Sequence, residues 1–431
     1  MNLNSLKARI ARLSEKPIVR HTLWMIMSRG LGLVLQAAYF VIIARALGAE
    51  QYGAFVGAMA LVSIVGPFVS WGCGDILIKY VSRNRAVFSQ YWGNALFVVF
   101  CSGLLLIVLI LVIAHFVLPP KIPILLVFLV AISNLIFGKV SDTAVRAFMS
   151  VSRLDVLAKI TVFSQASALI TAIIFANLFK KYGVIAWACL YILNAVLVAL
   201  VHFVTVSRLI GSPRLELSLI KNEIAEGFFF SISLSAQTIY NDIDKTMLAR
   251  LSTLDATGIY AAAYRLIDVA FVPISSLSAA TYSKFFQQGA TGISGTLKLG
   301  KRLALSAGLY GIVAFIGLLV FAPIVPYVLG EEYANTVGAL RWLALIPFFR
   351  GLQYFGADTL TGAGFQGLRS AMQIGIALFN ILLNLWIIPR YSWQGAAWSS
   401  LASDGLLMVS LWSVVYLLYR QQPQHLQEEK E

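Results

Sequence analysis

The feature of this sequence that most constrains its fold is a series of long apolar segments separated by short polar breaks. A helix rises about 1.5 Å per residue, so roughly 20 apolar residues cross the hydrocarbon core of a bilayer. Twelve segments reach that length, with turn-forming residues such as Pro119, Pro120 and Gly211 in the breaks. The predicted spans are 22–46, 52–78, 91–117, 122–147, 157–179, 184–207, 224–249, 256–284, 303–328, 335–362, 368–388 and 394–419.

Composition supports a membrane location. Of the 431 residues, 59% are hydrophobic and 12% are charged, whereas about a quarter of the residues in soluble domains are charged. The net charge of +14 would favour nucleic acid as a partner in a soluble protein. In a membrane protein it reflects the Lys and Arg that collect in cytoplasmic loops, so we expect no nucleic acid partner. Residues 1–21 lack the pattern of a cleaved signal peptide and are expected to form a basic lead-in on the cytoplasmic membrane surface.

The distribution of Lys and Arg among the loops predicts the orientation. Alternate loops, counted from the N-terminus, contain about 21 of these residues on one side and about 7 on the other. Because cytoplasmic loops are enriched in positive residues, both termini are predicted to be cytoplasmic. An even number of spans agrees with that arrangement, and the predicted location is the bacterial inner (cell) membrane.

The two halves of the chain resemble each other. Residues 44–53, at the junction of spans one and two, are similar to residues 249–258, at the junction of spans seven and eight, some 205 residues later. Six spans separate the copies, so both halves face the same way, as in a parallel repeat about an axis along the membrane normal. We therefore predict an all-α polytopic membrane protein with two six-helix bundles related by a pseudo-two-fold axis. The predicted divisions are a lead-in at 1–21, bundles at 22–210 and 211–420, and a cytoplasmic tail at 421–431.

Several cations lie inside predicted spans, where an ionisable group is costly and marks a pathway or a site by default. Arg29 lies in span one and has no acidic residue at helical spacing. Arg265 lies near the middle of span eight, but Asp268 follows it at i+3, so a structural ion pair is an alternative interpretation. Lys245 in span seven and Arg350 in span ten complete the predicted set of substrate-binding cations.

Four carboxylates also lie in or near the predicted membrane interior: Asp242, Asp244, Asp358 and Asp404. Each could carry a coupling proton or Na⁺, or could neutralise a cavity arginine, and the sequence does not decide between these roles. Two other sets have spacings that favour structural ion pairs near the cytoplasmic face. These sets are Asp75 with Lys79, and Lys139 with Asp142 and Arg146.

No catalytic constellation is found in the sequence. The four histidines are scattered, the three cysteines lack CxxC spacing, and GxSxG, Walker A and HExxH motifs are absent. We therefore expect a protein that is not an enzyme and needs neither a cofactor nor a metal.

Two segments carry a resemblance to a known family. Residues 380–391, followed by Gly395-Ala396-Ala397, resemble the region of the eleventh and twelfth helices of bacterial polysaccharide transporters, the O-antigen-type flippases. The stretch 28–32, with 44–48 and Tyr52-Gly53, is similar to the same family. The resemblance implies a central cleft open to one side at a time and transport of undecaprenyl-pyrophosphate-linked oligosaccharide for O-antigen or exopolysaccharide synthesis. It also implies polysaccharide polymerases and glycosyltransferases as partners, and we expect a monomer.

Other functions are open at this point. The peptidoglycan-precursor flippases of the same superfamily usually have a second arginine where this chain has Leu35, and they commonly have two extra helices. A cation-coupled multidrug and toxin exporter of the same fold would use one of the interior carboxylates for coupling. A membrane glycosyltransferase or polymerase usually has a large extracytoplasmic loop, whereas the outer loops predicted here are short.

Overall fold

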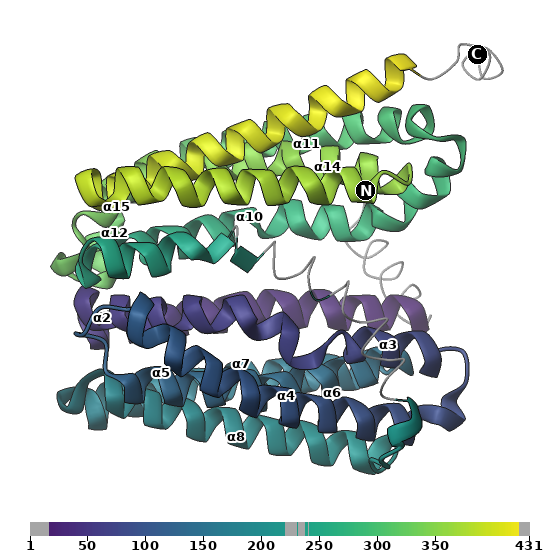
Figure 1. The fold of residues 1–431 in the computed structure, drawn as a ribbon, viewed down its shortest axis with the longest axis horizontal. Helices are drawn as coiled ribbons and strands as arrows, with labels where there is room; N and C mark the ends of the chain where they lie inside the picture. Colours follow the sequence, from purple (N-terminus) through teal and green to yellow (C-terminus); the bar gives the residue numbers. More distant parts are fainter. Residues whose placement is uncertain (1–16, 220–230, 232–237, 240, 422–431) are drawn as a thin grey trace, which may run out of the picture. The chain divides into compact units, whose positions relative to one another are not determined.

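The computed structural model describes residues 17–219, 231, 238–239 and 241–421, and every regular element in those ranges is helical (Figure 1). The first elements are α2 (Pro17–Ser70), α3 (Cys73–Val81), η1 (Arg85–Val87), α4 (Phe88–Val117), α5 (Ile124–Ala131), η2 (Ile132–Gly138), α6 (Lys139–Ser150), α7 (Leu154–Ile174), η3 (Phe175–Phe179), η4 (Lys180–Tyr182) and α8 (Gly183–Leu209). They are followed by α10 (Leu254–Gln288), η5 (Gly289–Thr291), α11 (Ile293–Phe321), η6 (Ala322–Ile324), α12 (Val325–Leu329), η7 (Glu331–Tyr333), α13 (Thr336–Leu343), α14 (Ile346–Gly362) and α15 (Gln366–Gln421).

Seven helical stretches within the described ranges are long and apolar enough to cross a membrane. They are Gly30–Ser70, Arg85–Val117, Ile124–Ser150, Asp155–Leu209, Leu254–Tyr282, Ile293–Leu329 and Gln366–Gln421. Most of the predicted seventh span, 224–249, falls outside the described residues, although 241–251 is helical. The predicted lead-in 1–21 and tail 421–431 also lie almost entirely outside them, so the twelve-span count and the position of the termini stay predictions.

Three of these stretches, Gly30–Ser70, Asp155–Leu209 and Gln366–Gln421, are too long for a single crossing. A straight helix of the 56 residues of α15 would be about 84 Å long, more than twice the thickness of the hydrocarbon core. The chain instead reverses at Ser392, which has φ 53° and ψ −136°. The Asn380 amide donates to the Ser403 hydroxyl (2.9 Å), and the Ser399 hydroxyl donates to Asn384 Oδ1 (2.5 Å). The two partners in each pair lie on opposite sides of Ser392 and at nearly equal distances along the chain, so α15 contains two antiparallel arms that match predicted spans 368–388 and 394–419.

Helix α2 and two predicted spans contain interruptions. In α2, Gly48 has φ 73° and ψ 173°, which are not helical values, and it falls in the predicted break between spans 22–46 and 52–78. Helix α2 then ends at Ser70, and Trp71 and Gly72 have positive φ before α3 begins. A π-helix, η2, separates α5 from α6 within one crossing, and such bulges occur frequently at functional sites.

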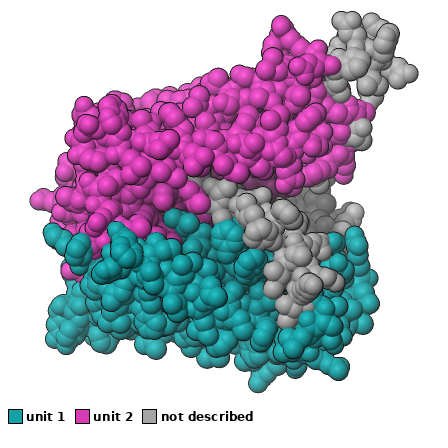
Figure 2. All heavy atoms as spheres, viewed as in Figure 1, with its two compact units in different colours: residues 1–47, 62–116, 120–235 teal, residues 48–61, 117–119, 236–431 magenta. Residues whose placement is uncertain are grey.

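The described chain divides into two compact units, coloured in Figure 2. Unit 1 comprises 1–47, 62–116 and 120–235, and unit 2 comprises 48–61, 117–119 and 236–431. In unit 1, Trp92 is fully buried and stacks against Phe88 and Phe203. In unit 2, α14 contacts α10, α11 and α15, so it lies at the centre of the helices that surround the site described below.

The two copies of the internal repeat meet within unit 2. A Cβ atom on Gly53 would lie 1.8 Å from the carbonyl oxygen of Leu254, and one on Gly258 would lie 2.0 Å from that of Ala49. Leu254 follows Ala49 by 205 residues, and Gly258 follows Gly53 by the same number. The contact is therefore reciprocal, as expected for two copies of one motif that face each other across a local two-fold axis. Glycine is required at both positions because the backbones touch.

The Glu332 carboxylate, in a third element, binds the backbone next to this glycine contact. Glu332, in η7, accepts a hydrogen bond from the Ala49 N–H at 3.0 Å. The repeat junction at 44–53 is thus held both by α10 and by the segment between α12 and α13. We call the Gly53–Leu254 and Gly258–Ala49 contacts the glycine seam.

Candidate functional site

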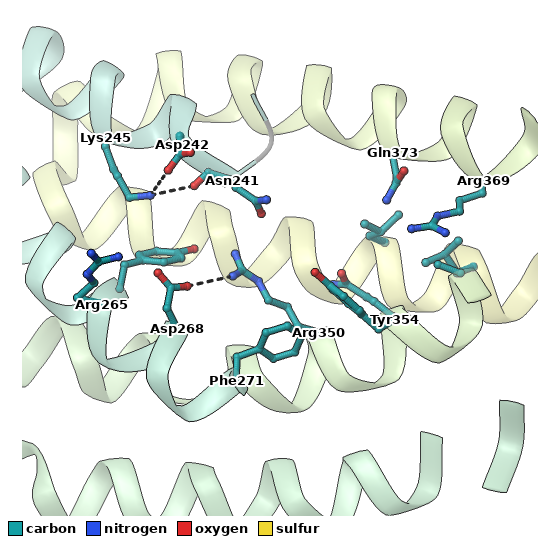
Figure 3. A pocket seen from close by; sticks show the side chains of 15 residues that line it. Asn241, Asp242, Lys245, Arg265, Asp268, Phe271, Arg350, Tyr354, Arg369 and Gln373 are labelled. Carbon is teal, nitrogen blue, oxygen red and sulfur yellow. Dashed lines mark hydrogen bonds and ion pairs between the residues drawn. The ribbon is translucent and has the colours of Figure 1, made fainter. Parts of the chain in front are cut away.

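A polar pocket of about 390 Å³ lies within unit 2. Its lining comes from residues 241–251, α10, α14 and α15, and comprises Asn241, Asp242, Lys245, Tyr264, Arg265, Asp268, Phe271, Arg350, Gln353, Tyr354, Ala357, Arg369, Gln373, Leu407 and Leu411. In Figure 3, Lys245 and Arg265 lie at one end, Arg350 in the middle, and Arg369 with Gln373 at the other end. A volume at the lower end of the usual range for ligand pockets is enough for a head group rather than a long chain.

Four of the lining residues are cations, and two of them flank one aromatic ring. The Tyr264 ring is buried, with Lys245 Nζ 5.1 Å and the Arg350 guanidinium carbon 5.5 Å from its centroid. Cation–π contacts of this kind are strengthened by desolvation. The ring therefore holds two positive groups beside the same pocket without neutralising either of them.

Arg350 is largely enclosed, with 11% of its side chain exposed. Its Nε lies 3.5 Å from Oδ2 of Asp404, whose side chain is 2% exposed, and its Nη1 lies 3.8 Å from Oδ1 of Asp268. Asp404 is fixed in turn by Gln353, whose amide donates to the Asp404 carboxylate (3.1 Å) and carbonyl (2.5 Å). A buried charge needs such partners because isolated burial is costly.

Arg265 differs from its neighbours in having neither a hydrogen bond nor an ion pair with any residue that the structure describes. The considered alternative, a structural pair with Asp268 along one face of α10, is not formed there, because Asp268 contacts Arg350 instead. Arg265 is partly buried at the pocket wall. Its guanidinium is thus available to an anion in the pocket, and guanidinium offers two parallel donors to a phosphate.

The ends of the pocket hold two further ion pairs. Lys245 donates to Asp242 at 2.5 Å and to the carbonyl of Asn241 at 3.1 Å. At the opposite end, Arg369 donates to the Thr361 hydroxyl at 2.9 Å and lies 3.9 Å from Asp358. These cations keep partners of their own, in contrast to Arg265.

The interior carboxylates fall into two groups. Asp242 lines the pocket, and Asp358 and Asp404 are paired with cations that line it. Asp358 also accepts a hydrogen bond from the buried Ser278 hydroxyl at 2.8 Å. Asp244 does not line the pocket; it is buried and accepts hydrogen bonds from the Tyr260 and Ser400 hydroxyls and from the Lys245 N–H.

Three of the four predicted substrate-binding cations therefore share one pocket: Lys245, Arg265 and Arg350. Arg29 lies in α2, but its side chain is outside the described residues. Two charged lining residues, Asp268 and Arg369, were not predicted as part of a site. In the sequence, Asp268 is related only to Arg265 by helical spacing, and Arg369 lies at the beginning of predicted span 368–388. Their proximity to the pocket results from contacts between helices, and these cannot be read from the spacing of residues along one helix.

In unit 1, the charged residues form structural contacts. Arg146 pairs with Asp75 across two helices, and Lys139 pairs with Asp142 at 3.3 Å. The predicted structural role of these residues fits both contacts, although Asp75 pairs with Arg146 rather than with Lys79. No group of His, Cys, Asp and Glu in the described ranges is placed to hold a metal ion.

The Arg350–Asp404 pair supports the first testable prediction. Asp404→Ala removes the buried carboxylate beside Arg350 and leaves the more distant, half-exposed Asp268. We therefore expect the free energy of unfolding to fall by roughly 3 kcal/mol. The free energy of unfolding measured in mixed detergent micelles tests this. Asp142→Ala is the matched control, because Asp142 is 64% exposed in its ion pair and exposed pairs contribute about 1 kcal/mol or less. Equal stability of the two variants would contradict a fixed role for Asp404.

Comparison with known proteins defines the class. The profile of the polysaccharide biosynthesis protein family matches residues 18–286, more than half of the chain. The chain therefore belongs to that family, and its apolar helices make it a multi-pass membrane protein. A search of curated protein sequences finds no match.

Solved structures share the fold at low sequence identity. An inward-facing multidrug resistance transporter of the MATE family, in the MOP superfamily, matches with a TM-score of 0.71 at 14% identity, covering 91% of this chain and 96% of that one. The lipid II flippase MurJ, in an inward closed conformation, matches with a TM-score of 0.70 at 13% identity, covering 92% of this chain and 87% of the other. An outward-facing MATE transporter gives 0.63 at 15% identity, covering 93% and 97%. At 13–15% identity, these similarities show a shared fold.

Proposed function

We propose that this protein is a flippase that moves undecaprenyl-pyrophosphate-linked oligosaccharide across the bacterial inner membrane by alternating access. The observation that carries the proposal is Arg265: a cation in a pocket of a membrane protein, with no ion pair among the described residues. Three further cations line the same pocket. The family to which the chain belongs supports a role in polysaccharide synthesis.

The chemistry of the pocket fits a diphosphate better than a neutral or cationic cargo. A diphosphate cannot cross hydrocarbon bare, because the solvation of its charge must be replaced. Arg265 offers paired donors, and Lys245 and Arg350 add positive charge at the same wall. The lipid chain stays in the bilayer while the sugars pass through the polar interior. We further propose that Arg29, in α2, contributes to the same diphosphate, and that the twelve spans form two six-helix bundles with both termini in the cytoplasm.

In this account the substrate arrives from glycosyltransferases in the cytoplasmic leaflet and leaves to a polysaccharide polymerase on the other side. The protein acts as a monomer. Assembly of O-antigen or exopolysaccharide is the proposed pathway class, because both need a lipid-linked repeat unit to change leaflets.

The second candidate is a cation-coupled exporter of the same fold. Asp244 favours it, because this buried carboxylate has hydroxyl and amide partners rather than a cation at its oxygens. Asp242, Asp358 and Asp404 are paired with Lys245, Arg369 and Arg350 and suit that role less well. In the flippase, Asp244 would serve ion coupling.

Deletion of the gene in its native host separates the two candidates. A flippase predicts loss of surface glycan, with the lipid-linked repeat unit accumulating in the cytoplasmic leaflet and unchanged sensitivity to cationic dyes. Intact surface glycan with increased dye sensitivity would contradict the proposal and favour the exporter.

A further inference from the structure

Arg350 contacts two carboxylates that differ in their exposure to solvent. Asp404 has 2% of its side chain exposed, whereas Asp268 has 50% exposed. The contact with Asp404 is 3.5 Å and that with Asp268 is 3.8 Å, and the latter is longer than a hydrogen bond. The Arg350 guanidinium thus has a buried partner, Asp404, and a more distant, half-exposed partner, Asp268.

Gln353 and the burial of Asp404 hold the Asp404 carboxylate in place behind Arg350. Gln353, one turn from Arg350 on α14, donates to both the side chain and the carbonyl of Asp404 on α15. For Asp268, the only described polar contact is the long one with Arg350. Because Asp268 is half exposed and its contact with Arg350 is longer than a hydrogen bond, Asp268 can leave Arg350 at small cost.

Among the described residues, the charges around the pocket balance. Its four lining cations are Lys245, Arg265, Arg350 and Arg369, and the carboxylates in contact with them are Asp242, Asp268, Asp358 and Asp404. A diphosphate adds at least two negative charges to this set. Any carboxylate that stayed at the binding wall would repel it, and in a partly enclosed site that repulsion is strong.

The position of Asp268 coincides with the place where an anion would bind. Asp268 follows Arg265 at i+3 on α10, so the two side chains start from neighbouring points, about 5–6 Å apart at Cβ. Its carboxylate points to Arg350, as Figure 3 shows. An anion at the position of the Asp268 carboxylate would therefore contact Arg350, and the Arg265 side chain could extend to it from the same face of α10.

We propose that Asp268 is a displaceable counter-anion: it takes the place of a substrate phosphate on Arg350 when no substrate is bound and leaves when a diphosphate engages Arg265 and Arg350. The inference rests on the proposed function and deepens it. Asp268 is a positioning and specificity-determining residue. Because it competes with the substrate for Arg350, it weakens binding and favours release, which a carrier needs in order to turn over.

The test is binding of a polyprenyl diphosphate to the purified full-length chain in lipid nanodiscs. Undecaprenyl diphosphate is the probe, undecaprenyl monophosphate the comparison ligand, and Kd the readout for wild type, Asp268→Asn, Arg265→Ala and Asp142→Asn. We expect Asp268→Asn to bind the diphosphate about tenfold more tightly than wild type, with a smaller gain for the monophosphate. Arg265→Ala should bind more weakly, and Asp142→Asn should match wild type.

The transport rate distinguishes the proposed role of Asp268 from a purely structural one, which would not change it in the direction opposite to affinity. In proteoliposomes, Asp268→Asn should transport a lipid-linked oligosaccharide more slowly than wild type despite its tighter binding. If Asp268→Asn binds no tighter while Arg265→Ala binds more weakly, the counter-anion role is wrong and the proposed function stands. If wild type and all variants fail to bind the diphosphate, both are wrong.

Discussion

Replacing Arg265 with alanine is expected to abolish export of surface glycan while leaving the protein in the membrane. Arg265 has no hydrogen bond or ion pair to lose among the described residues and is only partly buried, so its removal disturbs the fold little. Loss of a charge-assisted interaction with phosphate costs about 2–3 kcal/mol, roughly a 30- to 150-fold loss in diphosphate affinity. Surface glycan in a complemented deletion strain, with membrane levels quantified by immunoblot, measures the effect.

The lysine variant separates charge from geometry. If Arg265→Lys restores export, a point charge is sufficient; if it does not, the planar pair of donors is required. Arg29→Ala should give the same loss as Arg265→Ala, because both cations are assigned to one diphosphate. Full export by both alanine variants would eliminate the cationic pocket as the binding site.

The second large effect is expected at the glycine seam. In Gly53→Ala and Gly258→Ala, the new methyl carbon would lie 1.8 Å and 2.0 Å from backbone oxygens of Leu254 and Ala49. Backbone cannot move away as a side-chain tip can, so each substitution forces the repeat junctions apart. We expect each variant to lose at least about 3 kcal/mol of stability. Fluorescence-detected gel filtration after a thermal ramp in detergent measures the loss as a lower melting temperature.

The matched control is a helix glycine with free space around it. A Cβ atom added at Gly317 in α11 or at Gly375 in α15 would have no other atom within 4 Å. Alanine at either position should therefore leave the stability of the protein unchanged or raise it by about 0.4–1 kcal/mol. A melting temperature for Gly258→Ala equal to that of Gly317→Ala would show that the backbones do not touch at the seam.

The membrane-crossing helices could be predicted well because hydropathy and length decide them locally. Helices α4, α8 and α10 end within about five residues of the predicted spans. Interruptions could not be predicted as well. Hydropathy does not register the π-helix at Ile132–Gly138 or the left-handed conformations of Trp71 and Gly72.

The candidate site was predictable in its residues but not in their pairing. The cost of burying charge identified Lys245, Arg265 and Arg350, and the structure places all three in one pocket. Helical spacing allowed a pair of Arg265 with Asp268 and favoured one of Asp75 with Lys79, whereas the structure pairs Asp268 with Arg350 and Asp75 with Arg146. Contacts between helices decided both cases. They left Arg265 available, which sequence spacing alone could not show.

Transport by purified protein tests the central claim most directly. Proteoliposomes containing the full-length chain would receive a fluorescent undecaprenyl-diphosphate-linked oligosaccharide in one leaflet, and the rate of its appearance in the other leaflet would be measured. We predict transport well above that of protein-free liposomes for wild type, and transport at the protein-free level for Arg265→Ala. Wild-type transport equal to that of protein-free liposomes, or an Arg265→Ala rate equal to wild type, would contradict the account.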